Sequence, residues 1–490
     1  MNFWRRGVRR RGARLKVGAR GTVAIAGATG FVGRALTAAL AGRRRVIGLA
    51  RHPPHPAPDL PVEWRRCDLF SLLQCEAALQ GAEQAVYLVH SMLPSAHLTQ
   101  GFFQDFDLIC ADNFARAAAQ AGVRQIVYLG GLIPDDQALS VHLRSRLEVE
   151  KTLASGDVPV TALRASIIVG PGGSSYRMFR ALVARAPVIP CPPWSRNLTQ
   201  PIALDDVLAL LIYCLEHPAS QSRSWDIGSA DVMTYRQLLE RTAVLLGLKR
   251  RFFSVAVPGT FWCRSWLGLV TGASQALVAP LIESVRHSMV CRDRRLQEAA
   301  SVPGIPFDVA VRAATARGQA LTRMGRDPHP LRHAPWRELY RYDVRSIQRL
   351  DLPSGRTARW AAEQYGAFLG RRFRWVLRAD VDSGRNVRFR LVGSRLCLVE
   401  LTFAQDRSQS DSRQVFYITG GALVRRVQRV TGRPRLEFRQ VLGGRILLVG
   451  IHDYRPALPW PLYSLTQAVI HLRAMRAFGR YLAALQSPGE

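Results

Sequence analysis

Lysine is almost absent from this chain of 490 residues: only Lys16, Lys151 and Lys249 occur among 68 basic residues, and the rest are arginine. Acidic residues are also scarce, 36 in all, so the formal net charge at neutral pH is +32. Such an excess predicts attraction to anionic surfaces, whether lipid or phosphorylated ligand. No module interleaves basic with aromatic residues in the way that nucleic-acid binding favours, so we expect no nucleic-acid partner.

Cysteine spacing excludes two further classes. The eight cysteines are scattered without a Cys-x-x-Cys pair, which predicts neither a metal site nor a disulfide framework and indicates a reduced, cytoplasmic protein. Residues 1–20 carry seven arginines and one lysine, and with the apolar run that follows they imitate a secretory signal. Because a glycine turn interrupts that run, we expect a basic, disordered tail. Anchoring of this tail at the inner face of a membrane is the alternative.

Long uncharged stretches are rare as well. Residues 265–282 contain no charge and approach the minimum length of a membrane span. They also contain Gly268, Gly272 and Pro280, which favour a pair of helices over one continuous span. We predict a helix pair that covers a cleft, with a membrane span as the alternative. Its apolar lining is expected from five residues: Trp262, Trp266, Leu267, Leu269 and Val270.

What the sequence does contain is a glycine-rich turn in an informative place. Residues 27–33 read Gly-Ala-Thr-Gly-Phe-Val-Gly, after the β-compatible run 22–26 and before the helix-forming stretch 34–41. Turns of this kind let backbone N–H groups approach a pyrophosphate, and the start of the helix adds a favourable dipole. The order strand, turn, helix therefore predicts a dinucleotide site.

The order of strand-like and helix-like segments along the chain predicts two domains. Strand-like and helix-like segments alternate through residues 21–310, which favours a doubly wound parallel sheet of the α/β class, with a substrate cap over about 230–295. An arginine- and proline-rich linker is expected over 311–340. Residues 341–490 read as antiparallel strands followed by a long helix at 462–485, which predicts a separate α+β, helix-grip-like domain.

Further motifs carry a family resemblance. They are Asp68-Leu69 after the third strand, Asn113 in a long helix, Arg164 with Ile168-Val169-Gly170-Pro171-Gly172, the segment 201–207, and Trp225-Asp226-Ile227-Gly228. With the glycine turn, they resemble the atypical and extended branch of the short-chain dehydrogenase/reductase superfamily. The first half of the chain is also similar to NmrA-like regulators and to the nucleotide-binding accessory subunit of respiratory complex I. The whole chain is similar to bacterial two-domain reductase-like proteins whose C-terminal domain is poorly characterised.

The resemblance implies a bound NADP or NAD. The implied contacts are Gly27, Thr29, Gly30, Phe31, Val32 and Gly33 around the pyrophosphate, Asp68 and Leu69 beside the adenine, and His90 in the cleft. Arg51 stands at the end of the second strand, where an acidic residue would select NAD. An arginine there suits a 2′-phosphate, so NADP is the first choice and NAD the second. The alternative is chance, because arginine is so common in this chain.

The catalytic residues of that superfamily are missing. Its members use a tyrosine four residues before a lysine, with a serine or threonine nearby, and no lysine of this chain has a tyrosine at that spacing. His142 and Arg146 occupy the corresponding positions, and Gly130-Gly131 stand at the serine site. A histidine beside a guanidinium can act as general acid or base. The alternative is that both residues only hydrogen-bond the ribose or nearby loops.

Two functions follow from the sequence. The first is an NADP-dependent oxidoreductase acting on an apolar substrate of the quinone or carbonyl type. The second is a non-catalytic NADP(H)-binding scaffold or redox sensor attached to a membrane or a protein complex. Arg473, Arg476 and Arg480 on the last helix fit peripheral contact with an anionic membrane, or else a helix docked on its own sheet with its arginines in water.

Overall fold

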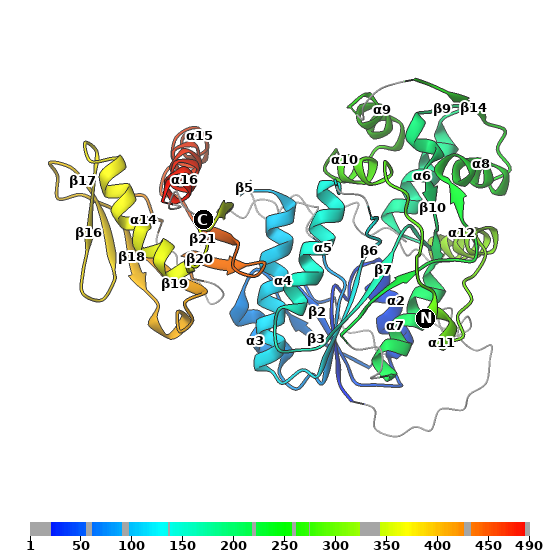
Figure 1. The fold of residues 1–490 in the computed structure, drawn as a ribbon, viewed down its shortest axis with the longest axis horizontal. Helices are drawn as coiled ribbons and strands as arrows, with labels where there is room; N and C mark the ends of the chain where they lie inside the picture. The colour runs from blue at the N-terminus through cyan, green and yellow to red at the C-terminus, as the bar shows by residue number, and fades with distance from the viewer. Residues whose placement is uncertain are drawn as a thin grey trace. The chain divides into compact units, whose positions relative to one another are not determined.

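The computed structural model describes residues 21–54, 61–90, 98–135, 138–217, 222–256, 261–273, 275–323, 344–425 and 433–485. The predicted tail 1–20 lies outside the described residues. The chain forms two compact units (Figure 1), one made of Met1–Leu93 with Ile109–Arg332 and the other of Pro94–Leu108 with His333–Glu490.

The first unit is built on a seven-stranded, all-parallel sheet in the order β12-β7-β6-β4-β1-β2-β3. Its strands are β1 (Val23–Ala26), β2 (Val46–Ala50), β3 (Val62–Arg66), β4 (Gln84–Tyr87), β6 (Gln125–Gly131), β7 (Val160–Ala165) and β12 (Ser224–Ile227). Every residue of β1 and β2 is buried, as expected for strands covered on both faces. The predicted doubly wound α/β fold is confirmed.

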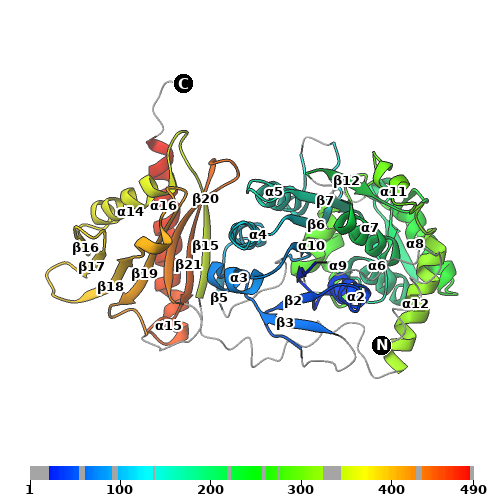
Figure 2. The same ribbon diagram turned by 90° about the horizontal axis from the view of Figure 1, so that it is seen from below.

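Helices cover both faces of this sheet. They are α2 (Phe31–Leu40), α3 (Leu72–Leu79), α4 (Phe103–Gln120), α5 (Val141–Ala154) and α7 (Leu204–Glu216). Figure 2 shows α3 and α5 on one side and α2 and α7 on the other. The strand order reverses between β1 and β4, and a sheet of this kind binds its ligands at the carboxyl ends beside that point.

A second layer of elements follows β7 in the chain and encloses its own apolar core. Its elements are β8 (Ile168–Val169), α6 (Ser174–Arg185), β9 (Val188–Cys191), η1 (Pro193–Arg196), β10 (Leu198–Thr199), β11 (Ile202–Ala203), β13 (Met233–Thr234), α8 (Tyr235–Leu245), β14 (Arg251–Ser254), α9 (Phe261–Thr271), α10 (Gln275–Ser284), α11 (Arg295–Ala299) and α12 (Phe307–Arg323). The uncharged stretch 265–282 forms parts of α9 and α10, as predicted. No helix in the described part of the chain is long and apolar enough to cross a membrane.

The region predicted as a linker begins inside a helix. Residues 311–323 form most of α12, because Phe307, Ala310, Val311 and Ala314 recur at helical spacing and are buried against the second layer. The rest of that range, 324–340, lies outside the described residues.

The second unit contains seven antiparallel strands in the order β16-β17-β18-β19-β20-β21-β15. They are β15 (Val344–Asp351), β16 (Leu377–Val381), β17 (Val387–Leu391), β18 (Cys397–Phe403), β19 (Arg413–Gly420), β20 (Arg435–Val441) and β21 (Ile446–Tyr454), with a short η4 (Gln405–Arg407). Helices α14 (Ala358–Arg372), α15 (Trp460–Leu465) and α16 (Gln467–Ala484) complete the unit. The predicted antiparallel sheet with a C-terminal helix is confirmed.

Aromatic rings fill the space between this sheet and its helices. The Tyr365 ring of α14 lies 5.4 Å from that of Phe438 on β20 and 5.1 Å from that of Phe478 on α16. The Phe368 and Phe478 rings are 5.3 Å apart. The two pairs made by Tyr365 are edge-to-face, and such packing adds to the stabilisation from burial. The arginines at 473, 476 and 480 lie on the exposed face of α16.

An eighth strand, β5 (Leu98–Gln100), joins this sheet from a distant part of the sequence. It pairs in parallel with β15, Leu98 opposite Val344 and Gln100 opposite Ser346. Gln100 Nε2 also donates to the carbonyl oxygen of Ala468, 3.3 Å away. The second unit therefore uses a segment that the chain supplies between β4 and α4.

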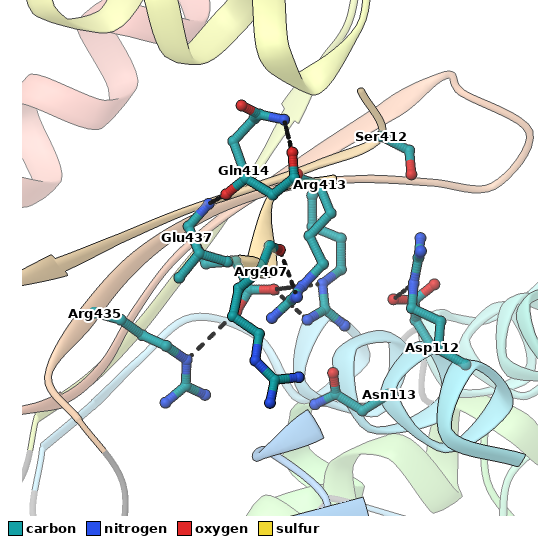
Figure 3. A network of polar contacts seen from close by, with 12 residues as sticks. Asp112, Asn113, Arg407, Ser412, Arg413, Gln414, Arg435 and Glu437 are labelled. Carbon is teal, nitrogen blue, oxygen red and sulfur yellow. Dashed lines mark hydrogen bonds and ion pairs between the residues drawn. The ribbon is translucent and has the colours of Figure 1, made fainter. Parts of the chain in front are cut away.

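A buried carboxylate is surrounded by arginines on the same sheet (Figure 3). Glu437 Oε1 accepts from Arg413 Nε at 2.6 Å and from Arg439 Nε at 3.0 Å, and Arg435 Nε lies 3.5 Å from Oε2. Burial alone would raise the pKa of Glu437, but Arg413, Arg439 and Arg435 hold it well below its usual range. The ion pairs compensate part of the cost of burying these charges.

Candidate dinucleotide site

The glycine turn has the geometry of an anion cradle. Gly27 follows β1 with a φ of +84°, a backbone conformation that only glycine adopts without strain, and its carbonyl oxygen accepts the Gly30 N–H at 2.8 Å. Gly30 is the N-cap of α2 and offers no capping side chain, and the first turn of the helix carries no acidic residue. The N-terminal N–H groups of α2 are thus left for an external anion.

Close packing leaves no space for side chains in this turn. A β-carbon on Gly33 would stand 2.0 Å from the carbonyl oxygen of Gly27 and 2.8 Å from the α-carbon of Ala28. A β-carbon on Gly27 would lie 3.2 Å from the carbonyl oxygen of Leu88, just beyond β4. The bare backbone, the helix start and the switch point between β1 and β4 fit the pyrophosphate of a dinucleotide.

The other residues of the turn face different ways. Thr29 is exposed, whereas Val32 is buried in the core of the unit. The Phe31 ring packs on the loop after β8, where β-carbons on Gly170 and Gly173 would lie 2.8 and 2.9 Å from it. Phe31 and Val32 therefore offer a ligand at the turn their backbone N–H groups.

The residues expected beside the nucleoside follow β2 and β3. Arg51 is exposed directly after β2. Asp68 Oδ1 accepts the N–H of Phe70 at 3.2 Å, and the carbonyl oxygen of Leu69 accepts from Asn113 Nδ2 at 2.8 Å. Asn113 is fully buried in α4, so it fixes the turn that carries Asp68 and Leu69. Asn113 was one of the residues that carry the family resemblance, but only the structure shows that its side-chain amide binds the carbonyl oxygen of Leu69.

His142 and Arg146 lie together at the carboxyl end of β6. Tyr128 of β6 donates its hydroxyl to the carbonyl oxygen of Arg146 at 3.2 Å, and the Arg146 stem would lie 3.5 Å from a β-carbon on Gly131. Burial, Arg146 and then His90 lower the pKa of His142 to about 3. The structure thus brings together His142, Arg146 and His90, with His142 neutral at physiological pH.

A chain of hydroxyl groups leads from the sheet into the second layer. Ser166, directly after β7, places its Oγ 2.9 Å from Oγ1 of the buried Thr199. Thr199 in turn hydrogen-bonds the Tyr235 hydroxyl, whose pKa is raised by burial. These groups join the carboxyl end of β7 to the wall of an apolar cavity.

That cavity has a volume of about 210 Å³ and a wall that is almost entirely apolar. It is lined by Met178, Phe179, Leu182, Pro190, Cys191, Pro192, Trp194, Ser195, Tyr235, Leu239, Val255, Cys263, Trp266, Leu267, Ile282 and Val285. The helix pair predicted within residues 265–282 lines this cavity through Trp266 and Leu267. The expectation for Leu269 is wrong: it is 84% exposed, because it falls on the opposite face of α9. Val270 packs against the core around the cavity, and the side chain of Trp262 lies outside the described residues.

Asp226, from the Trp-Asp-Ile-Gly motif, anchors a segment that borders a second, polar cavity. Its Oδ2 accepts from the backbone N–H of Arg292 at 3.2 Å and from Nε at 3.0 Å. The cavity, about 390 Å³, adjoins the chain after β6 and is lined by residues that include Asn197, Arg286, Ser288 and Arg292. Within the described residues no group of His, Cys, Asp or Glu is placed to hold a metal ion, and all eight cysteines are free thiols.

Sheet order, glycine turn and uncapped helix together define a dinucleotide-binding Rossmann domain, joined here to a second α+β unit. Comparison with known proteins agrees. The family model described as NAD(P)H-binding matches residues 27–178. Ceramide reductase of Caulobacter vibrioides is 31% identical over 244 residues, which are 49% of this chain and 75% of that protein.

Two further similarities are to a second relative and to a solved structure. Auxiliary protein GraX of Staphylococcus aureus is 31% identical over 118 residues, so the match spans 24% of this chain and only 38% of the length of GraX. The structure of Citrobacter sp. triphenylmethane reductase complexed with NADP(H) aligns with 60% of this chain and 99% of its own, at 17% identity and a TM-score of 0.47. The chain belongs to the NAD(P)H-binding family of Rossmann proteins, to which its match over residues 27–178 and its similarity to ceramide reductase assign it.

Proposed function

We propose that the chain is an NADP-dependent oxidoreductase for an apolar substrate with a reducible carbonyl or quinone group. The observation that carries this proposal is the apolar cavity in the unit that holds the dinucleotide cradle. Its wall reaches the carboxyl end of β7 through Ser166, Thr199 and Tyr235. The name of the relative from C. vibrioides, ceramide reductase, agrees with a long apolar substrate.

The residues of this chain have separate tasks in such a reaction. Gly27, Gly30 and the start of α2 bind the pyrophosphate, and Arg51 pairs with the 2′-phosphate that distinguishes NADP from NAD. The apolar wall excludes water and holds the substrate chain. When bound, the reduced nicotinamide would supply a hydride, and formation of the alcohol or quinol would also require one proton.

Two groups of the site can be compared as sources of this proton. His142, with a pKa near 3, is neutral and can only accept or donate a hydrogen bond at neutral pH. The hydroxyl groups of the chain Tyr235–Thr199–Ser166 carry protons at neutral pH, and burial raises the pKa of the Tyr235 phenol further, so it holds its proton until a strong base forms beside it. Tyr235 is therefore the better candidate for the donor, and His142 and Arg146 for positioning the cofactor and its ribose.

The test is oxidation of NADPH by the full chain with a panel of long-chain ketones, aldehydes, quinones and ceramide-related ketones. Cys263→Trp, which fills the rim of the cavity, should raise KM at least about tenfold and leave the Kd for NADPH unchanged. Cys397→Trp is the matched control, because this cysteine is also half-buried but belongs to the second unit. Turnover that is insensitive to Cys263→Trp would exclude this cavity as the substrate site.

A non-catalytic NADP(H)-binding protein is the second candidate. It is favoured by the lack of a Tyr-x-x-x-Lys sequence and by the low pKa of His142, which together remove the usual proton donor. Tight NADPH binding without oxidation across the whole panel would support this candidate over the enzyme.

A further inference from the structure

Three exposed apolar side chains mark one end of the first unit. Leu269 on α9 is 84% exposed, Phe253 on β14 46% and Val188 on β9 45%. Figure 1 shows α9, β9 and β14 together at the upper end of this unit. β9 and β14 pair in parallel, α6 packs on α9, and residues of β9 and α9 line the same cavity, so these segments adjoin one another. We call Val188, Phe253 and Leu269 the apolar edge.

Basic side chains border the apolar edge, and their contacts fix them there. Arg185 Nη1 donates to the carbonyl oxygen of Val270 at 3.0 Å, one residue from Leu269. Arg250 donates to the carbonyl oxygens of Val183 and Ala184, at 2.7 and 2.9 Å. Both arginines thus sit at carboxyl ends of helices, where the helix dipole favours a cation.

Two more cations complete this border. Arg251 stands opposite Val188 in the pairing of β14 with β9, and Lys249 precedes it by two residues. Both are exposed. We call Arg185, Lys249, Arg250 and Arg251 the basic rim.

Neighbouring carboxylates do not neutralise the basic rim in the contacts that the structure shows. Glu240 pairs with Arg236 at 2.7 Å, and Glu283 pairs with Arg264. Each of these acids is thus held by an arginine outside the rim. The surface presents a positive border around apolar side chains, the composition of a protein face that lies on an anionic lipid surface.

The apolar edge is also the outside of the cavity wall. On α9, Cys263, Trp266 and Leu267 line the cavity, and Leu269 points away from it into solvent. On the other side, Val255 lines the cavity directly after β14, which carries Phe253. Cys263, Trp266 and Val255 are only half-buried, so the cavity rim lies at this same surface.

We propose that the apolar edge and the basic rim dock the protein on an anionic phospholipid bilayer, with the rim of the apolar cavity against the lipid. The basic rim pairs with headgroup phosphates, and Val188, Phe253 and Leu269 enter the interface below them. An apolar molecule then moves between bilayer and cavity without crossing water. This surface belongs to the first unit alone and is distinct from the arginines of α16.

The first test is sedimentation of the full chain with vesicles of phosphatidylcholine and phosphatidylglycerol in equal parts. Phe253→Asp with Leu269→Asp should weaken binding at least about tenfold, because two charges replace apolar groups in the interface. The matched control is Leu73→Asp with Val309→Asp, two residues 47% and 54% exposed on α3 and α12. The control makes the same change in net charge and should bind like the unaltered protein.

The net charge of +32 attracts the whole chain to anionic vesicles, so the rim needs a charge-matched comparison. Lys249→Glu with Arg251→Glu should weaken binding far more than Arg43→Glu with Arg312→Glu, both exposed arginines elsewhere. Hydrogen exchange of the full chain should slow in β14 and α9 on addition of vesicles, and not in α3.

The proposal is overturned if edge and control variants bind vesicles equally, or if exchange slows only in other segments. A dimer in solution that the edge variants dissolve would show an interface between two copies instead. These measurements need no turnover, so they stand or fall independently of the proposed enzyme activity.

Discussion

The carbonyl oxygen of Gly27 lies 2.0 Å from the point where Gly33 would carry a β-carbon. That contact joins the end of β1 to the first turn of α2 and leaves the backbone bare for a pyrophosphate. Gly33→Ala should therefore push the turn open. We expect a loss of at least about tenfold in NADPH affinity and a destabilisation of about 1–3 kcal/mol from overpacking. Fluorescence titration and denaturant unfolding measure the two effects.

Gly318→Ala is the control for that substitution. Gly318 lies within α12, and a β-carbon there would meet no atom within 4 Å. Alanine should stabilise the helix by about 0.5–1 kcal/mol and leave NADPH affinity unchanged. Equal NADPH affinity in Gly33→Ala and the unaltered chain would contradict the assigned cradle.

Arg51 should decide the choice of cofactor. A guanidinium paired with the 2′-phosphate contributes a charge-assisted contact, so Arg51→Ala should raise the Kd for NADPH about tenfold or more and leave that for NADH unchanged. Arg43→Ala removes an exposed arginine near the start of β2 and should change neither constant. If NADH binds the unaltered chain more tightly than NADPH, the preference for NADP is wrong.

His142 should make the fold sensitive to acid. Its pKa is about 3 in the folded chain, below the ordinary value of 6.5, so the unfolded chain binds the extra proton between those two pH values. The contribution of His142 to the free energy of unfolding is therefore fully present above pH 6.5. It is lost as the pH drops toward 3, by at most about 1.4 kcal/mol per pH unit. His142→Gln should lessen that slope in urea unfolding measured between about pH 6.5 and pH 4.5.

The same substitution separates His142 from the other histidines. Burial also lowers the pKa values of His452 and His471, and these two remain in the His142→Gln variant. The difference between the two slopes therefore belongs to His142. Identical slopes would show that this side chain is solvated in the folded protein.

Glu437 should be far more important for stability than an exposed glutamate. Glu437→Gln leaves Arg413 and Arg439 buried without their shared carboxylate, and removal of one partner from a buried ion pair costs about 3–5 kcal/mol. Glu400→Gln breaks the more exposed pair with Arg388, 2.9 Å, and should cost about 1 kcal/mol or less. Equal losses in thermal unfolding would contradict the role of the buried cluster.

The sequence predicted the first unit well because its signals are local. β1 and β2 are short apolar runs, and the glycine turn is contiguous with the strand and helix that it joins. In the second unit α14 was not predicted, although Thr357 marks its start by accepting the N–H of Trp360. β5 has only three residues and is defined by a partner far along the chain, which no local pattern reveals.

The sequence predicted which residues of the candidate site lie near one another, and it did not predict their chemistry. The sequence placed His142 and Arg146 at one position of the fold, and the structure does bring them together. The protonation of His142 depends on burial, on Arg146 and on His90, which belongs to another strand end. The cavity likewise is lined by residues of six separate elements. The prediction for Leu269 was wrong because it rested only on the apolar character of the neighbouring residues.

The pairing of β5 with β15 has a consequence for synthesis of the chain. Residues 98–100 leave the ribosome roughly 240 residues before β15, which at about 5–20 residues per second is a delay of roughly 10–50 s. During that time the first unit can complete its parallel sheet, while the 94–108 segment still lacks the sheet it will join. The nascent chain therefore carries β5 as an unpaired strand during this interval. A translation pause near residue 340 would lengthen the time in which a chaperone can bind it.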